Sequence, residues 1–342
     1  MISQQFSLQA HNTLRLRSEA QYFAAPSSEA ELCALLQRYA TEHPVTVLGG
    51  GSNVVLAEYV PGLVLHPRLL GKALLRQEGS HVLVQVAAGE DWDTTVAWAL
   101  AQGWQGLENL SLIPGHCGAA PVQNIGAYGV ELADVLHSVR AVHIPTQQQK
   151  EFTLAECQFS YRDSYFKSIA PGEWVITAIV LRLRAQGEAL ALGYGDVAEA
   201  FARLPKEEQN AEGLRQVICH IRSAKLPDPK LLANAGSFFK NPVVAEKHYA
   251  ALAAEHPNVV AYAMPDGTFK LAAGWLIEQA GWKGHQPDGI GMHSQQALVL
   301  VNHRENACAA DVLGIADAVK ESVWRQFKVA LEQEPLILPR PL

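Results

Sequence analysis

The hydrophobic and polar positions of this chain follow two periods, one helical and one alternating, which predicts a mixture of helices and strands. Residues 27–42 carry leucines at helical spacing behind Ser28 and Glu31, a pattern that predicts a capped helix. Residues 91–103 predict a second helix that ends at a glycine, and residues 309–327 predict a third. Strand patterns occur on both sides of a glycine turn within 44–56, and again over 81–88, 139–144, 174–184 and 297–303.

The remaining segments divide the chain into regions. Residues 200–215 are polar and are expected to form loops or a helix, whereas 270–284 predicts a helix with a glycine exit. Two prolines within five residues mark 225–236 as a domain junction, and 331–339 is expected to be extended. A chain of 342 residues with this order of elements is expected to form two or three α+β domains.

Composition and charge exclude several classes of protein. The net charge is −7 and the basic residues are scattered, which argues against a nucleic-acid partner. No apolar stretch approaches the length of a membrane span, and the polar N-terminal segment lacks the hydrophobic core of a signal peptide. Five cysteines without a C-x-x-C pair are typical of reduced thiols, so we expect a cytoplasmic protein. The histidine spacings predict no metal site.

Two glycine-rich segments carry the first candidate chemistry. The segment LGGGSN (48–53) is not a dinucleotide fingerprint of the Rossmann type, because Val54 occupies the third glycine position and a strand follows. Its backbone N–H groups can form either an anion-binding nest or a simple tight turn. The second segment, 113–129, has four glycines between Pro114 and Gly129 and no charged residue. Together the two segments favour a bulky nucleotide cofactor held mainly by the backbone.

The segment NAGSFFKNP (234–242) poses a separate question, because Ser237 can be interpreted as an acyl-transfer nucleophile, a helix cap or a residue with a less familiar role. It lacks the G-x-S-x-G elbow of serine hydrolases, and no histidine lies near it in the sequence. These observations argue against acyl transfer.

Eight motifs in order then point to a known family. They are GGGSN, PVQNIGAYG, YRDS, KLPDP, NAGSFFKNP, KLAAGWLI, HSQQALVLVN and LEQE. From about residue 14 to the C-terminus the chain closely resembles the UDP-N-acetylenolpyruvoylglucosamine reductases, and the motif GYGD is similar to the longer, type I branch. The resemblance implies non-covalent FAD, NADPH as co-substrate, and reduction of an enolpyruvyl ether of UDP-N-acetylglucosamine for peptidoglycan precursor synthesis. It implies small-molecule partners only, and we expect a monomer.

The same resemblance implies an α+β fold of three parts. Two α+β subdomains of the vanillyl-alcohol-oxidase (PCMH) type form the FAD-binding module, and a C-terminal α+β domain binds the substrate. The expected boundaries are 1–68 with the tail 328–342 for the first subdomain, 69–224 for the second, and 225–327 for the substrate domain.

Site residues are carried over motif by motif. The resemblance implies that Arg162 stabilises the charge of an enolate, that Ser237 gives the proton to C2 after hydride transfer to C3, and that Glu334 assists as a carboxylic acid, with Glu332 as the neighbour with which it can be confused. The expected cofactor-binding residues are Gly49, Gly50, Gly51, Ser52, Asn53, Pro114, Gly115, Gly118, Ala119, Gln123, Asn124, Gly126 and Ala127. The expected substrate-binding residues are Tyr128, Tyr194, Lys225, Asn241, Tyr262 and Gln296.

One departure from the family and two other functions stay open at this point. The family usually has a hydroxyl residue and a small aliphatic one where this chain has His116 and Cys117, and relatives in the wider fold attach FAD through His or Cys. We interpret the change as a benign substitution. A sugar or alcohol oxidase on the same FAD scaffold is the alternative enzyme, and a nucleotide-binding regulator is the non-enzymatic alternative.

Overall fold

The computed structural model describes residues 2–185 and 189–340, and the chain divides into two compact units. The first unit contains residues 1–6, 20–51 and 61–224. The second contains residues 7–19, 52–60 and 225–342. The predicted division into two FAD subdomains and a substrate domain remains a prediction.

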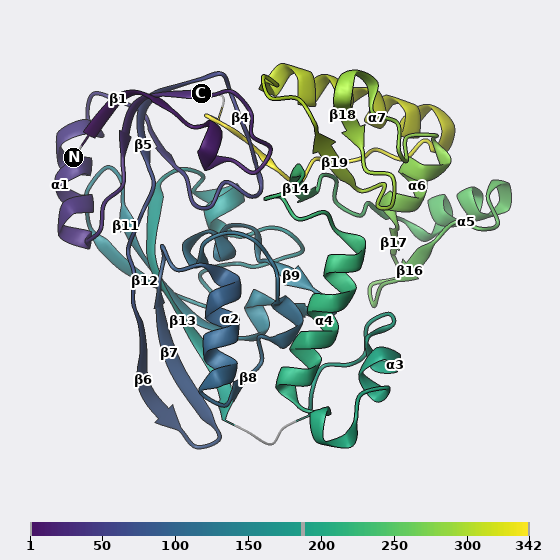
Figure 1. Cartoon of the computed structure of the whole chain (residues 1–342), viewed down its shortest axis with the longest axis horizontal. Helices are drawn as coiled ribbons and strands as arrows, with labels where there is room; N and C mark the ends of the chain where they lie inside the picture. Colours follow the sequence, from purple (N-terminus) through teal and green to yellow (C-terminus); the bar gives the residue numbers. More distant parts are fainter. Residues whose placement is uncertain (1, 186–188, 341–342) are drawn as a thin grey trace. The chain divides into compact units, whose positions relative to one another are not determined.

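A six-stranded antiparallel sheet dominates the first unit, in the order β12-β11-β13-β7-β6 with β8 paired to β13 (Figure 1). Strands β11 and β7 flank β13, so that Ile179 of β13 is opposite both Val139 and Val86. All three side chains are buried in one hydrophobic cluster. The strands are β6 (Lys72–Glu78), β7 (His81–Ala87), β8 (Trp104–Gln105), β11 (Leu136–His143), β12 (Gln149–Thr153) and β13 (Trp174–Ala185).

Helix α2 (Trp92–Ala101) packs against this sheet as the sequence predicts. It begins at Asp91, whose carboxylate accepts a hydrogen bond from the Thr94 amide at 2.8 Å. Its buried residues Trp92 and Val96 belong to the same cluster as the strands, and the Trp92 indole donates to the Leu110 carbonyl at 2.9 Å. The helix therefore fixes the chain that leads into the second glycine segment.

A smaller sheet in the order β1-β2-β5-β3 carries the first glycine segment at the end of β3. Helix α1 (Glu29–Tyr39) packs on it through Leu32 and Leu36, and the Ser28 hydroxyl accepts from the Glu31 amide at 3.2 Å, which confirms the predicted cap. The strands are β1 (Ile2–Ser7), β2 (Glu19–Ala24), β3 (Val45–Val47) and β5 (Tyr59–Leu65).

The rest of the first unit is built from short elements. Residues 117–123 form the 3-10 helix η3, and residues 165–169 form the π-helix η5. Helices α3 and α4 pack together through Phe201 and Leu214. The bounds are β9 (Gly126–Ala127), β10 (Val130–Glu131), α3 (Val197–Ala202) and α4 (Ala211–Lys225).

The second unit has three small sheets around one core of its own. They have the orders β14-β19-β18 and β15-β17-β16, and a parallel pair joins β4 to β20. Helices α6 and α7 cover β18 and β19 (Figure 1). The bounds are β4 (Val54–Leu56), β14 (Ala233–Ser237), β15 (Val243–Val244), β16 (Ala261–Ala263), β17 (Phe269–Leu271), β18 (Ile290–Met292), β19 (Val299–Asn302), β20 (Leu336–Leu338), α5 (Glu246–Glu255), α6 (Ala273–Gln279) and α7 (Ala309–Phe327).

One predicted helix is shorter than its pattern. Residues 270–284 were expected to be helical, but Lys270 and Leu271 belong to β17, where Lys270 is opposite Val243 and Tyr262. Helix α6 begins only at Ala273, because the Asn241 side chain accepts its first amide at 3.0 Å. None of the helices in the described part of the chain is long and apolar enough to cross a membrane.

Candidate active site

The two glycine segments lie against each other in the first unit. A methyl group on Gly50 would lie 2.8 Å from the Gly115 Cα, and one on Gly49 would lie 3.2 Å from the Ala119 Cβ. Gly118 is equally restricted, since its methyl group would lie 2.5 Å from the Ala88 Cβ. Two backbone segments approach this closely only where glycine removes the side chains. We call these two glycine segments, 48–53 and 113–129, the cradle. The cradle fits the backbone-held nucleotide cofactor that the sequence predicts.

His116 and Cys117 have different surroundings within this cradle. The His116 ring lies 5.3 Å from the His66 ring, and its Nδ1 is buried without a hydrogen-bond partner among the described residues. Burial, together with the facing His66, lowers the pKa of His116, so the ring is neutral at neutral pH. An unpaired buried ring nitrogen is costly, and a polar cofactor could satisfy it after rotation of the ring.

Cys117 is unsuited to covalent attachment of a flavin. Its side chain is fully buried and lies 3.4 Å from the Thr95 hydroxyl. Burial raises the pKa of the Cys117 thiol to about 12, so the thiol is protonated at neutral pH. The thiol packs in the core beneath η3, in agreement with the predicted non-covalent cofactor.

Asn124 and Gly126 connect the second glycine segment to neighbouring turns. The Asn124 side chain donates to Glu131 at 2.7 Å and accepts from the Ala133 amide at 3.0 Å, so its own bonds stabilise the loop. The Gly126 carbonyl accepts from the Arg162 guanidinium at 2.8 Å. A methyl group on Gly126 would lie 2.9 Å from Arg162 Nη1 and would displace this end of the flexible side chain.

Arg162 occupies a tight turn with a positive φ of 58°. The two ends of this turn, Ser160 and Asp163, exchange backbone hydrogen bonds of 3.2 and 3.1 Å. The guanidinium carbon lies 5.4 Å from the centre of the Tyr161 ring. The Arg162 side chain is thereby directed along the second glycine segment.

Tyr128 and Tyr194 meet edge to face in the first unit, with ring centres 6.0 Å apart. Tyr128 is half buried and burial raises its pKa, whereas Tyr194 is exposed. Arg222 of α4 is a neighbour that the sequence analysis did not select. Burial lowers the pKa of Arg222, Tyr128 opposes this shift, and Arg222 Nε is buried without a partner among the described residues. A buried guanidinium with an unpaired donor is a candidate anion contact.

Ser237 and Glu334 come together in the second unit. Ser237 ends β14, directly after Gly236, whose φ is 68°. The Glu334 amide donates to the Phe238 carbonyl at 2.9 Å, and Gln333 forms a bridge with Phe239. The backbone of the tail at Gln333 and Glu334 therefore pairs with the two residues that follow Ser237.

Glu332 has a different environment from Glu334. It is exposed and its carboxylate forms an ion pair with Lys240, whose amide also donates to the Glu332 carbonyl at 2.9 Å. Lys240 is thus the ion-pair partner of Glu332. Glu334 is half buried, which suits a carboxylic acid better than an exposed ion pair does.

Phe238 and Phe239 follow Ser237 and are fully buried in the core of the second unit, with ring centres 5.3 Å apart. They fix the end of β14. The other predicted substrate residues in this unit are Lys225 at the end of α4, Tyr262 exposed on β16, Asn241 and Gln296. The last two lie at the first turn of α6, where the Asn241 side chain accepts the Ala273 amide and a methyl group on Gly274 would lie 3.5 Å from Gln296 Oε1. Their roles remain predictions.

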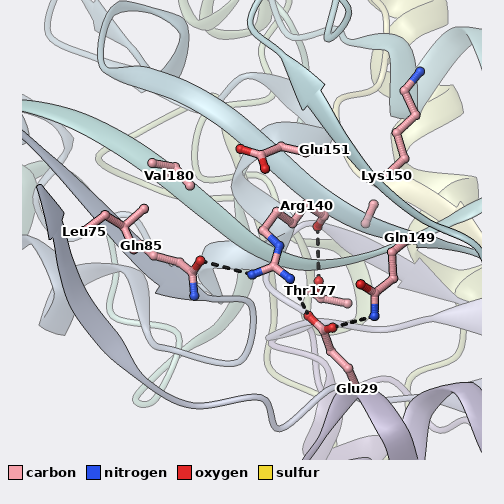
Figure 2. Close-up of a pocket in the computed structure, with 10 residues that line it drawn as sticks. Glu29, Leu75, Gln85, Arg140, Gln149, Lys150, Glu151, Thr177 and Val180 are labelled. Atoms are coloured by element: carbon pink, nitrogen blue, oxygen red, sulfur yellow. Dashed lines mark hydrogen bonds and ion pairs between the residues drawn. The ribbon is translucent and has the colours of Figure 1, made fainter.

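A hollow of about 320 Å³ on the large sheet is lined by none of these residues (Figure 2). Figure 2 shows Arg140 between Gln85 and Glu29, with Nη1 donating to the Gln85 side chain at 3.1 Å and Nη2 lying 3.8 Å from the Glu29 carboxylate. Gln149 also donates to Glu29, at 2.9 Å. Because its polar groups bind one another, we assign no ligand to this hollow. The described residues contain no cluster suited to a metal ion.

The fold and the cradle define a class of protein, and comparison with known proteins identifies it. Residues 20–150 match the family model of an FAD binding domain. The fold is similar to 6-hydroxy-D-nicotine oxidase from Arthrobacter nicotinovorans, with a TM-score of 0.53 at 11% identity over 96% of this chain and 86% of that one. The protein is a flavoprotein with an FAD-binding domain, as predicted.

The family is narrower than this class. Residues 228–338 match the model described as the C-terminal domain of UDP-N-acetylenolpyruvoylglucosamine reductase. The reductases of that name from Alcanivorax borkumensis and Pseudomonas fluorescens are 49% and 45% identical, over 96% and 98% of this chain and 94% and 98% of theirs. The crystal structure of the Thermus caldophilus reductase has a TM-score of 0.67 at 25% identity, over 99% of this chain and 98% of that one. The chain belongs to the UDP-N-acetylenolpyruvoylglucosamine reductase family and is an FAD-dependent oxidoreductase.

Proposed function

We propose that this protein reduces the enolpyruvyl ether of UDP-N-acetylglucosamine to UDP-N-acetylmuramate, with NADPH as the reductant. FAD, when bound, would supply the hydride-transfer chemistry that couples oxidation of NADPH to reduction of the enolpyruvyl group at C3. The remaining tasks fall to the protein: it must bind two anionic substrates, stabilise the negative charge that develops on the substrate carboxylate and C2, and supply one proton.

Arg162 is proposed to stabilise the developing charge. A guanidinium is permanently charged and can bind a carboxylate or enolate through two N–H groups. The bond to Gly126 uses one Nη2 donor and fixes the orientation of the group, so the side chain is pre-organised before the charge appears.

Ser237 is proposed to donate the proton to C2. A serine hydroxyl is a weak acid, so it can act only towards a strongly basic carbanion or with help from a neighbouring group. The adjacent Glu334 is proposed to give that help as a carboxylic acid. The backbone bond from the Glu334 amide to the Phe238 carbonyl supports this proposal, because Phe238 directly follows Ser237 in the chain.

The binding roles that the sequence implies are proposed for the same reaction. The residues proposed to bind FAD are Gly49, Gly50, Gly51, Ser52, Asn53, Pro114, Gly115, Gly118, Ala119, Gln123, Asn124, Gly126 and Ala127. The six residues predicted to bind substrate keep that role. We further propose that the protein works in the cytoplasm as a monomer and without nucleic acid.

Absorbance of the purified protein tests this function directly. We expect a visible flavin band that bleaches on adding NADPH without oxygen and recovers on adding the enolpyruvyl substrate. Recovery with O₂ but not with the substrate would instead support the oxidase alternative. A protein that cannot be loaded with flavin would contradict both enzymes.

A further inference from the structure

The backbone of the turn that carries Arg162 has a conformation that the surrounding residues must hold in place. At a φ of 58°, a residue with a side chain is in the left-handed region, which persists only where the surroundings hold it. The next element is η5 (Tyr165–Ile169), a five-residue π-helix of the kind that is frequent at functional sites. Hydrogen bonds from this π-helix to the turn therefore affect the orientation of the Arg162 guanidinium.

Lys167 forms a hydrogen bond with the backbone of Arg162. Its Nζ donates to the Arg162 carbonyl at 2.9 Å, and the bond is partly buried. Other hydrogen bonds hold the start of the π-helix. The buried Ser164 hydroxyl donates to the Val122 carbonyl at 2.7 Å, and the Tyr165 amide donates to the Cys157 carbonyl at 2.8 Å. The neighbouring Ser168 hydroxyl donates instead to Asp163, at 2.6 Å.

We propose that Lys167 is a positioning residue, whose bond to the Arg162 carbonyl holds the left-handed turn and thereby directs the guanidinium. This inference rests on the proposed role of Arg162. A charged donor forms a stronger bond to a carbonyl than a neutral one, which suits a turn that must resist relaxing to a negative φ. Once the turn is held, the guanidinium keeps its bond to Gly126 and the geometry needed to meet the enolate.

The hydrogen bond between Lys167 and Arg162 cannot be predicted from the sequence. Lys167 lies five residues after Arg162, a spacing that has no meaning in an ordinary helix or strand. It becomes a contact only because the turn reverses the chain and the π-helix brings the ammonium back to it.

A double-mutant cycle tests the inference in the FAD-loaded protein. The variants are Lys167→Met, Arg162→Ala and both together, and the two half-reactions are followed by flavin absorbance. We expect Lys167→Met alone to slow flavin reoxidation by the enolpyruvyl substrate about tenfold or more, because small misplacements of a catalytic group have large effects. Bleaching by NADPH should stay within about twofold of the parent. In the Arg162→Ala background, Lys167→Met should change reoxidation by less than about twofold, since coupled residues are not additive.

Two further variants separate positioning from general damage. Lys167→Arg keeps a charged donor and should recover most of the lost rate, whereas Ser168→Ala removes a bond of the same π-helix that does not end on Arg162 and should change little. If Lys167→Met does not fold with FAD, Lys167→Gln takes its place in the cycle. Equal losses in both backgrounds, or no loss from Lys167 substitution alone, would overturn the inference. Normal reoxidation in Arg162→Ala would instead refute the proposed role of Arg162.

Discussion

Gly50 shows at the scale of one residue how the two glycine segments reach each other. A Cβ there would lie 2.8 Å from the Gly115 Cα, and since the obstacle is backbone it cannot move aside as a flexible side chain could. Glycine is therefore required for close approach and not for a special φ.

We predict that Gly50→Ala weakens FAD binding. Relieving this contact should cost about 1–3 kcal/mol, as overpacking does elsewhere, and a cost of that size in binding is a rise in the FAD dissociation constant of roughly five- to 150-fold. Titration of the apoprotein by flavin fluorescence measures it. Gly314→Ala is the control, because a methyl group at this helical position meets nothing within 4 Å. An unchanged dissociation constant for Gly50→Ala would mean that the cradle does not hold the cofactor.

The neighbouring carboxylates Glu332 and Glu334 offer a matched pair of substitutions. Glu334→Gln should slow substrate-driven flavin reoxidation by about 10²-fold or more, the usual effect of losing a general acid. Glu332→Gln should have little effect, because that exposed group only forms an ion pair with Lys240. Both variants should be reduced by NADPH like the parent. The reverse ranking in the substrate half-reaction would show that the two roles are exchanged.

At the scale of elements, helices α2 and α4 are joined by an ion pair in the first unit. Arg215 donates two hydrogen bonds to Asp93, of 2.7 and 3.0 Å, and the Leu112 amide adds a third, of 2.6 Å. Burial alone would raise the pKa of Asp93, but these bonds outweigh burial and hold the pKa below its usual range.

We predict that Arg215→Met lowers the stability of the first unit by about 1–2 kcal/mol, since it leaves a half-buried carboxylate without its charged partner. The bonds stabilise the fold fully above the ordinary Asp pKa of about 4, and this contribution is lost as the pH falls through the lowered folded value. Urea denaturation midpoints of the parent and variant should therefore converge at acidic pH. Arg203→Met removes an exposed pair with Glu199 and should leave the midpoint unchanged.

The pattern of residues predicts the strongly periodic elements best. Helices α1, α2 and α7 begin and end close to the predicted residues, because caps and buried stripes are local signals. Strand β6 escapes prediction because it is exposed along most of its length and has no hydrophobic alternation. The predicted helix at 270–284 starts late because strand pairing by Lys270 overrides its helical pattern.

The residues of the proposed site likewise divide into those with a local sequence signal and those without one. Motif order identifies Arg162, Ser237 and Glu334 as candidates, since each stands in a short recognisable string. Lys167 and Arg222 cannot be found this way, because their importance comes from contacts and burial that only the folded chain creates.

At the scale of the whole molecule, the proposed reaction assigns tasks to both units. Arg162 and most of the cofactor cradle belong to the first unit, whereas Ser237 and Glu334 belong to the second. Reduction by NADPH requires neither the proton donor nor its neighbour. The account therefore predicts that the two half-reactions respond separately to substitution at Ser237.

Flavin absorbance of a Ser237→Ala variant tests this central claim most directly. We predict that NADPH bleaches the flavin of this variant at the parent rate, whereas the enolpyruvyl substrate restores the colour at least about 10²-fold more slowly, because the substrate carbanion has lost its acid. Equal slowing of both half-reactions, or recovery by substrate at the parent rate, would contradict the assignment of Ser237 as the proton donor.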